Sequence, residues 1–414
     1  MKKLVALLLA LTLCIGLCAC GATAEKPAEE TPATTGETET PATDAKDIKV
    51  GFIFLHDENS TYDLNFINAA KAAAAELGLS DDQIMMKTNI AESQACYDAA
   101  AELVDAGCDL VITDSFGHES FALAAAKEFP EVQFVSCTGV KAHTEGLSNF
   151  HNAFASIYEG RYLAGVAAGL KLNEMIENGD ITAEEAKMGY VGAYPYAEVK
   201  SGYTSFFLGA RSICPSVTME VTFTSSWYDE ALEKEAANKL INNGCVLISQ
   251  HADSMGAPTA CETAGVPNVS YNGSTVAACP NTFIVSSRID WTPFFVYAIN
   301  CVASGEDIGY DWTGTLATGS VVLTEVNEQA AAAGTVEKIA EVMKALEDGS
   351  VKVFDTATFT VNGETVTTYL ADVDDLGDYV GETEAISYGA FLESFYRSAP
   401  YFDLDIDGIT NLDA

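Results

Sequence analysis

The folded part of the chain begins with a short apolar run, Ile48-Lys49-Val50-Gly51-Phe52-Ile53-Phe54-Leu55, which leads through a polar loop into residues 63–77. The run is continuous and rich in β-branched and aromatic residues, which predicts a strand buried on both faces. Residues 63–77 are rich in alanine and are followed by Gly78, as is typical of a helix and its C-terminal cap. A buried strand followed by a helix is the repeating unit of a parallel sheet that is covered on both faces.

The same alternation of apolar runs and helical segments continues to about residue 350. The further expected strands are residues 84–87, 109–113, 133–137, 188–194, 218–224, 246–250, 268–271, 283–287 and 321–324. The further expected helices are residues 92–106, 119–129, 156–172, 198–211, 230–243, 256–264, 293–303 and 335–347, and a hairpin is expected to turn at Asn362-Gly363. The pattern restarts at residue 156, so we predict an α/β fold with two doubly wound parallel-sheet lobes.

We expect the chain to pass between the lobes more than once, which makes a hinged clamshell. Lobe 1 is expected to span residues 48–153, with residues 283–315 returning to complete it. Lobe 2 is expected to span residues 154–282, with residues 316–400 completing it, and residues 401–414 are expected to form an acidic tail. Open α/β sheets bind ligands beyond the carboxyl ends of their strands, so we expect the site in the cleft between the lobes.

The composition excludes several classes of function. The 414-residue chain is 48% hydrophobic, which is too apolar for a disordered protein, and it carries 60 Asp and Glu against 21 Lys and Arg. The net charge of -39 argues against binding to nucleic acid, whose phosphates require many cations, and against docking on an anionic membrane through a basic patch. A protein that faces a small ligand or a carbohydrate is compatible with this charge.

The first twenty residues have the features of a bacterial export signal. Two lysines precede an apolar run, residues 4–17, that is too short to span a bilayer as a helix. The run ends in Leu17-Cys18-Ala19-Cys20-Gly21, which resembles the lipobox of bacterial lipoproteins and implies cleavage before Cys20 and attachment of a diacylglycerol to its thiol. An ordinary secreted protein with a chance cysteine is the alternative. Residues 21–47 lack apolar periodicity and are expected to be a disordered tether.

No sequence motif for catalysis or metal binding is complete. The sequence has no P-loop, no G-x-G-x-x-G and no G-x-S-x-G motif, and His118-Glu119 lacks the second histidine of a zinc protease. Asp403, Asp405 and Asp407 begin a calcium-loop pattern, but its twelfth position is Ala414 instead of a glutamate. The eight cysteines beyond Cys20 show no C-x-x-C spacing and are expected to be buried free thiols. We therefore expect no cofactor, no metal and no enzymatic activity.

Two loops that follow predicted strands carry an aromatic residue towards the start of a helix. Tyr62 lies after the first strand of lobe 1, and Trp227 follows a strand of lobe 2. Aromatic rings from opposite lobes can clamp a flat ring, and stacking on a nucleobase contributes about 1–3 kcal/mol per base. The strand ends Gln250-His251-Ala252-Asp253-Ser254 and Tyr271-Asn272-Gly273 suit the edge of a base or the hydroxyls of a sugar. Helix capping and filling of the lobe surfaces explain the two aromatics equally well.

Five short segments of the chain, in this order, share a resemblance to one protein family. They are Tyr158-Glu159-Gly160-Arg161-Tyr162-Leu163-Ala164-Gly165, Met188-Gly189-Tyr190-Val191-Gly192, Trp227-x-Asp229-x-x-x-Glu233-Lys234, Leu240-Ile241-x-x-Gly244 and Gln250-His251-x-Asp253-Ser254. Together they resemble the basic membrane protein family, whose members are lipoprotein substrate-binding subunits of ABC importers, several of which bind purine nucleosides or bases. The resemblance covers about residues 48–354 and implies a type I periplasmic-binding-protein clamshell.

The resemblance also implies a ligand site. Tyr62 and Trp227 stand where the family places its base-stacking aromatics, and the polar contacts carried over are Asn65, Ser115, Asp229, Gln250, Asp253 and Asn272. Nucleoside binders of the family usually have Gly-Val-Asp where this chain has Ser270-Tyr271-Asn272, and a lysine where it has Arg288. A neutral amide bonds a ribose hydroxyl more weakly than a carboxylate does, so a free purine base is expected as an alternative to a nucleoside.

The resulting prediction is a substrate-binding lipoprotein of an ABC importer, anchored by lipid on the extracytoplasmic face of the cell membrane. It is expected to be a monomer that captures a purine nucleoside or base between its lobes and delivers it to a permease and its ATPase. The alternatives are a sugar or another small metabolite as ligand, a surface sensor lipoprotein, and a surface nucleoside hydrolase.

Overall fold

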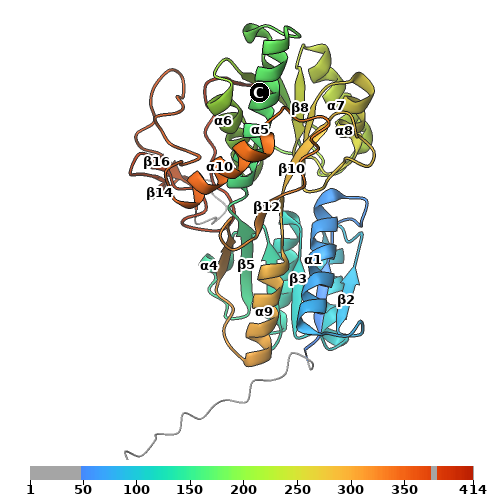
Figure 1. The fold of residues 1–414 in the computed structure, drawn as a ribbon. Helices are drawn as coiled ribbons and strands as arrows, with labels where there is room; N and C mark the ends of the chain where they lie inside the picture. The colour runs from blue at the N-terminus through green and yellow to red at the C-terminus, as the bar shows by residue number, and fades with distance from the viewer. Residues whose placement is uncertain (1–47, 374–379, 414) are drawn as a thin grey trace, which may run out of the picture. The chain divides into compact units, whose positions relative to one another are not determined.

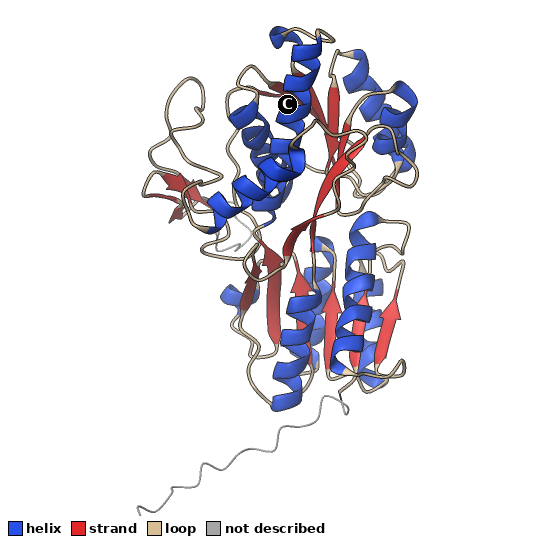
Figure 2. Cartoon of the chain, viewed as in Figure 1, coloured by secondary structure: helices blue, strands red, loops and turns tan. Residues whose placement is uncertain are grey.

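Two sheets of mainly parallel strands organise the computed structural model, which describes residues 48–373 and 380–413 (Figure 1). The export signal, Cys20 and the tether predicted for residues 1–47 lie outside the described residues. Both sheets belong to one unit of the chain, Ala42–Ala414. Helices cover both faces of the strands (Figure 2), as the continuous apolar strand runs predict. In the described part of the chain, no helix combines the length and the apolarity needed to cross a bilayer.

The first sheet contains six strands, all parallel. From edge to edge they are β2 (Ile84–Lys87), β1 (Val50–Ile53), β3 (Leu110–Thr113), β4 (Gln133–Cys137), β5 (Phe150–Ala155) and β11 (Asp311–Gly314). The helices of this half are α1 (Thr61–Leu77), α2 (Gln94–Asp105), α3 (Glu119–Glu128), α4 (Ala142–Glu145) and α9 (Thr292–Ser304). Side chains of α1 and α9 share one apolar core with β1, in which Phe66 stacks on Trp291.

The second sheet contains seven strands, of which only β12 runs antiparallel to its neighbour. From edge to edge they are β17 (Ile409–Asn411), β7 (Thr218–Phe223), β6 (Lys187–Gly192), β8 (Leu247–Gln250), β9 (Asn268–Tyr271), β10 (Phe283–Ile289) and β12 (Val321–Leu323). The helices of this half are α5 (Ile157–Asn178), α6 (Ala197–Ile213), α7 (Glu230–Asn242), α8 (Gly256–Ala264) and α10 (Thr335–Glu347).

The prediction that residues 283–287 return to the first lobe was wrong. They belong to β10, which pairs with β9 and β12 in the second sheet, whereas the next helix, α9, does pack against α1. Each sheet places its first five strands in the order second, first, third, fourth and fifth, and β5 and β10 are the two fifth strands. The sequence pattern does not reveal β5, because His151 and Asn152 interrupt its apolar run, and without β5 the pattern favours β10 as a strand of the first sheet.

The chain after α10 packs against the second sheet and includes the short strands β13 (Leu370–Ala371), β14 (Thr383–Glu384), β15 (Ile386–Ser387) and β16 (Ala390–Phe391). The turn predicted at Asn362-Gly363 is present, since Val361 and Glu364 exchange two backbone hydrogen bonds. The expectation of an acidic tail at residues 401–414 was wrong, because this segment contains β17. Its strand is paired with β7, and Phe402 is fully buried nearby.

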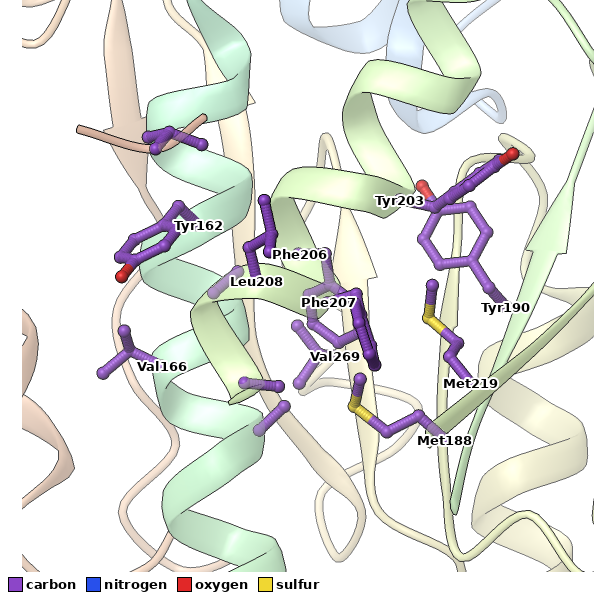
Figure 3. Close-up of a cluster of buried hydrophobic side chains, with 14 of the residues drawn as sticks. Tyr162, Val166, Met188, Tyr190, Tyr203, Phe206, Phe207, Leu208, Met219 and Val269 are labelled. Atoms are coloured by element: carbon purple, nitrogen blue, oxygen red, sulfur yellow. The ribbon is translucent and has the colours of Figure 1, made fainter. Parts of the chain in front are cut away.

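Two glycines allow α5 and α6 to approach each other closely. A Cβ on Gly165 of α5 would overlap the backbone oxygen of Phe206, and a Cβ on Gly209 of α6 would overlap that of Tyr162. Figure 3 shows Tyr162 and Val166 on α5 beside Phe206, Phe207 and Leu208 on α6, with Met188 and Met219 of the sheet below them. The glycine-containing face of α5 is therefore the surface on which α6 packs.

We expect Gly209→Ala to destabilise the protein by about 1–3 kcal/mol, because the added methyl group has only backbone to displace. Urea unfolding followed by circular dichroism measures the change. Gly309→Ala is the control, since a Cβ there meets nothing nearer than the Tyr297 hydroxyl at 3.8 Å. Equal unfolding midpoints for the two variants would contradict the close approach of the helices.

Candidate ligand-binding site

A cavity of about 390 Å³ lies where the carboxyl ends of strands from the two sheets meet. The loops after β1, β3 and β4 line it from the first sheet with Leu55, His56, Ser115, Phe116, Thr138 and Val140. The second sheet lines it with Pro195, Tyr196, Glu198, Trp227, His251, Asp253 and Tyr271, which lie at the ends of β6, β7, β8 and β9. Parallel strands place all these loops at one edge, and the volume is that of a site for a small molecule.

Aromatic side chains make up much of the cavity wall. Tyr62 is carried on the first turn of α1, where its hydroxyl donates to the backbone oxygen of Asp114 at 2.7 Å. Trp227 packs edge-on against Tyr194, with ring centroids 5.1 Å apart, and Tyr194 stacks on Tyr196. Each of the two predicted aromatics is thus held in place by a neighbour, which leaves a rigid apolar surface for a ligand.

The two halves of the protein touch beside the cavity. The backbone N–H and the hydroxyl of Thr61 both donate to the backbone oxygen of Asp253, at 3.1 and 3.2 Å. His56 contacts Tyr228, and Phe116 contacts Tyr196, with ring centroids 5.4 and 5.7 Å apart. Because each contact joins the first half to the second, the structure shows a closed form in which the cavity is bounded by both.

A pair of carboxyl groups fixes the loop that carries His56 and Tyr62. Burial and the nearby Asp63 raise the pKa of Asp114 well above its usual range. Burial acts in the same direction on Asp63, but hydrogen bonds from His56, Asp114 and Ser60 outweigh it and leave its pKa lowered. The two groups therefore hold a proton on Asp114, while Asp63 accepts from the His56 N–H at 2.7 Å and the Ser60 hydroxyl at 2.6 Å.

Asp253 is buried in the cavity wall on the other side. Burial raises the pKa of its carboxyl well above the usual range, and the charges of Asp63, Glu233 and Glu198 act in the same direction. The side-chain amide of Asn272 donates to it at 3.2 Å. A protonated Asp253 can both donate and accept a hydrogen bond, which an ionised carboxylate cannot do.

Arg161 on α5 is buried behind the cavity and orients His251 and Glu198. Its guanidinium lies 3.5 Å from the ring centroid of Tyr271 and donates to Nδ1 of His251 at 3.0 Å. Since Nδ1 accepts, Nε2 carries the proton and donates to Glu198 at 2.8 Å. Burial lowers the pKa of His251 although Glu198 opposes this, so the imidazole is neutral.

Four of the eight predicted site residues line the cavity, namely Tyr62, Ser115, Trp227 and Asp253. Asn65 and Asn272 are buried beside it, and the Asn65 amide lies 3.4 Å from the Asn272 side-chain oxygen. The other two predicted residues have contacts of a structural kind. Asp229 caps α7 by accepting from the N–H groups of Ala231 and Leu232, and Gln250 accepts from the amide of Asn268.

Sequence reasoning missed Glu198, His56 and Tyr196 as cavity residues. All three follow a strand, as do the residues that were predicted, so the signal was their position in the loops. Glu198 also lies at the start of a helix, in α6. His251 has both a cavity position and a structural contact, since it lines the cavity and bonds Glu198.

A protein family matches most of this chain. The family of ABC transporter substrate-binding proteins of the PnrA-like type, Bmp, matches residues 53–353. This chain belongs to that family. The prediction of the family from the sequence is confirmed.

Relatives of this Bmp protein include a purine-binding protein of Brucella abortus (strain 2308), 31% identical over 261 residues, which are 62% of this chain and 69% of the relative. A Haloferax volcanii protein, named as a candidate glucose-binding protein of an ABC transporter, is 31% identical over 217 residues. That match covers 52% of this chain and 52% of the relative, so this chain spans about half of it.

The fold of this Bmp protein is shared with solved solute-binding proteins. One from an ABC transporter system of Aeropyrum pernix K1 matches with a TM-score of 0.61 at 17% identity and covers 74% of this chain and 93% of that one. The predicted α/β clamshell of the periplasmic-binding-protein type is therefore confirmed.

The calcium-loop pattern of this Bmp protein has a structural explanation. Asp403 and Asp405 both pair with Lys200, and Asp407 accepts from the Thr360 hydroxyl and the Gly363 N–H. Across the described residues, no group of three His, Cys, Asp or Glu side chains is placed to hold a metal ion. The eight cysteines beyond Cys20 are buried and free, as predicted.

Replacing Asp253 should change how stability depends on pH. Its raised pKa means that the folded protein binds this proton more tightly than the unfolded chain, so the stability it contributes is present at low pH and is lost as pH rises through the raised value. Asp253→Asn stays neutral, so we expect its unfolding midpoint in urea to rise relative to the wild type as the pH increases from about 4, where this carboxyl ionises in the unfolded chain.

The matched control for this experiment is Asp98→Asn, which removes an exposed carboxylate on α2. The difference between this control and the wild type should stay constant over the same pH range. Parallel curves for Asp253→Asn and the wild type would show that Asp253 is ionised in the folded protein.

Proposed function

We propose that this ABC transporter substrate-binding protein captures a purine nucleoside or purine base and delivers it to a membrane permease and its ATPase. The observation that carries the proposal is that Tyr62 and Trp227, from the two halves of the protein, line one cavity. Stacking of a flat ring against such aromatics contributes about 1–3 kcal/mol per base. The purine-binding relative of Brucella abortus supports the same class of ligand.

The polar groups of the cavity suit the edge of a purine. Glu198 is a charged acceptor for an exocyclic amine or a ring N–H, and a protonated Asp253 offers a donor to a ring nitrogen. Ser115 adds a hydroxyl whose own proton goes to Glu92 at 2.6 Å, so it is free to accept. A base carries hydrogen-bond donors and acceptors side by side on its edge, and these three side chains likewise offer both donors and acceptors.

The charge of the cavity argues against phosphorylated ligands. Besides the protonated Asp253, the carboxyl groups of Asp63, Glu198, Asp372 and Asp403 line it, and Arg397 is the lining arginine among the described residues. A phosphate would have to approach several of these groups in a place with little water, which is unfavourable. We therefore propose that neutral bases and nucleosides bind and that nucleotides do not.

Ligand capture needs no covalent chemistry. A ligand that contacts both halves binds the closed form more tightly than an open one, and this difference in affinity shifts the population towards closure. The contacts of Thr61 with Asp253 and of Phe116 with Tyr196 join the two halves, so we expect closure to form them and opening to break them. We propose that the permease recognises the closed form and that the protein is a monomer without enzymatic activity.

A sugar is the second candidate ligand. Aromatic rings also stack on the apolar faces of sugars, and the Haloferax volcanii relative is named for glucose binding. In that case the carboxylates of the cavity would bond hydroxyl groups. Titration with glucose beside purines separates the two candidate ligands.

Calorimetric titration with adenine, hypoxanthine, adenosine, inosine, AMP and glucose tests the proposal. We expect at least one base or nucleoside to bind, and AMP and glucose to give no heat. Thermal shift is the second measurement. Binding of glucose alone would favour the sugar, and turnover of a nucleoside to a free base would establish an enzyme.

Trp227 provides the test of stacking. We expect Trp227→Ala to weaken purine binding roughly tenfold or more, because the loss of stacking costs about 1–3 kcal/mol. Trp227→Phe keeps a ring and should bind within a few-fold of the wild type. The chain has three tryptophans, so the ligand-induced fluorescence change should vanish in Trp227→Phe while emission from Trp291 and Trp312 remains. Unchanged affinity of Trp227→Ala would refute stacking.

We further propose that Cys20 carries a diacylglycerol that holds the protein on the extracytoplasmic face of the cell membrane. Cys20→Ser should move the full chain from the membrane fraction to the soluble fraction and abolish labelling by a radioactive fatty acid. Cys18→Ser, two residues away, is the control and should leave both properties unchanged. Membrane retention of the Cys20→Ser protein would exclude this anchor.

A further inference from the structure

The chain beyond the family match forms part of the cavity wall. The match to the Bmp family ends at residue 353, yet Tyr369, Leu370, Asp372, Arg397, Tyr401 and Asp403 all line the cavity. Neither the strand pattern nor the resemblance of the sequence predicted any ligand contact there. The residues of this wall, 369–373 and 397–403, are all described by the structure.

The wall is attached firmly to the second half of the protein. Phe354 stacks on Phe402 with ring centroids 4.4 Å apart, and both are buried in the core that contains α5 and α6. Beyond the wall, β17 pairs with β7. Lys200 on α6 pairs with Asp403 at 2.8 Å, which holds this carboxylate at the cavity. Fixed groups of this kind can select a ligand because little order is lost when it binds.

The same segment reaches the first half of the protein. The backbone N–H of Ser398 donates to the side chain of Asp311, on β11, at 2.6 Å. The wall therefore bridges the two halves where the cavity lies, and a ligand there meets it in the closed form.

The wall offers charged and hydrogen-bonding groups, unlike the aromatic rings of Tyr62 and Trp227. Arg397 donates from Nε, Nη1 and Nη2 to the backbone oxygens of Ala399, Val373 and Pro400. These bonds use three of the five N–H donors of the guanidinium, so two remain for a ligand. The carboxylate of Asp403 adds an acceptor in the same wall.

We propose that this wall selects a hydroxylated substituent on the bound ring, so that the cavity favours a nucleoside over its free base. Hydroxyl groups both donate and accept, which matches a guanidinium and a carboxylate in one cavity wall. Asn272 donates to Asp253 instead of lining the cavity, so Asp403 supplies a charged acceptor at another place. This inference rests on the proposed binding of purines.

A matched pair of variants tests the wall. Asp403 and Asp405 both pair with Lys200, at 2.8 and 3.0 Å, but only Asp403 lines the cavity. Asp403→Ala should weaken the binding of adenosine and inosine about tenfold and leave adenine and hypoxanthine within twofold, because a hydrogen bond to a charged group is lost. Asp405→Ala should change none of the four affinities by more than about twofold.

A second pair keeps the test valid if the first variant folds poorly. Arg397→Gln should lower nucleoside affinity in the same selective way, whereas Arg211→Gln should not. Arg211 also donates to backbone oxygens of the C-terminal segment, those of Thr358 and Asp407, but it does not line the cavity. Thermal unfolding of each variant shows whether the fold is kept.

The outcomes separate this inference from the proposed function. Selective loss of nucleoside affinity in Asp403→Ala or Arg397→Gln supports the wall. Equal losses for base and nucleoside, unchanged affinities, or a wild type that binds bases but no nucleosides overturn it and leave purine binding intact. A wild type that binds none of the four compounds overturns both.

Discussion

Backbone hydrogen bonds between parallel strands are the interaction on which the rest of the structure depends. Every pair in the first sheet is parallel, and in the second only β12 runs the other way. The carboxyl ends of parallel strands must lie at a common edge, so their loops meet there. His56, Ser115, Trp227 and His251 come from four such loops, and none is near another in sequence.

Close packing of helices places a second set of groups behind the cavity. Gly165 and Gly209 let α5 and α6 lie almost backbone to backbone, which brings the first turns of α5 up to the sheet. Arg161 can then cover the ring of Tyr271 and bond His251. The hydrogen bond between His251 and Glu198 at the cavity thus depends on Arg161, which lies one helical turn before Gly165 on α5.

Prediction succeeded where a residue's role follows from its own segment. The strand and helix patterns gave β2, β4, β9, α8 and α10 with the observed ends, because these segments carry clear apolar periodicity. It failed for β5, whose His151 bonds Gln133 and the backbone of Gly309 although it is buried in the sheet. It also failed for β10, since the sheet that a strand joins depends on pairing partners distant in the chain.

The sequence alone determined the family, the α/β alternation and the loops that carry Tyr62, Ser115, Trp227 and Asp253, because ordered motifs and periodicity are local properties. Tertiary structure decided which polar groups face the cavity. It turned Gln250 to a structural contact with Asn268 and raised the pKa of Asp253 through burial and neighbouring carboxyl groups. It also brought Arg397 and Asp403 to the site from a segment without regular periodicity. These outcomes depend on which distant side chains share a small buried volume, and only the folded chain specifies that.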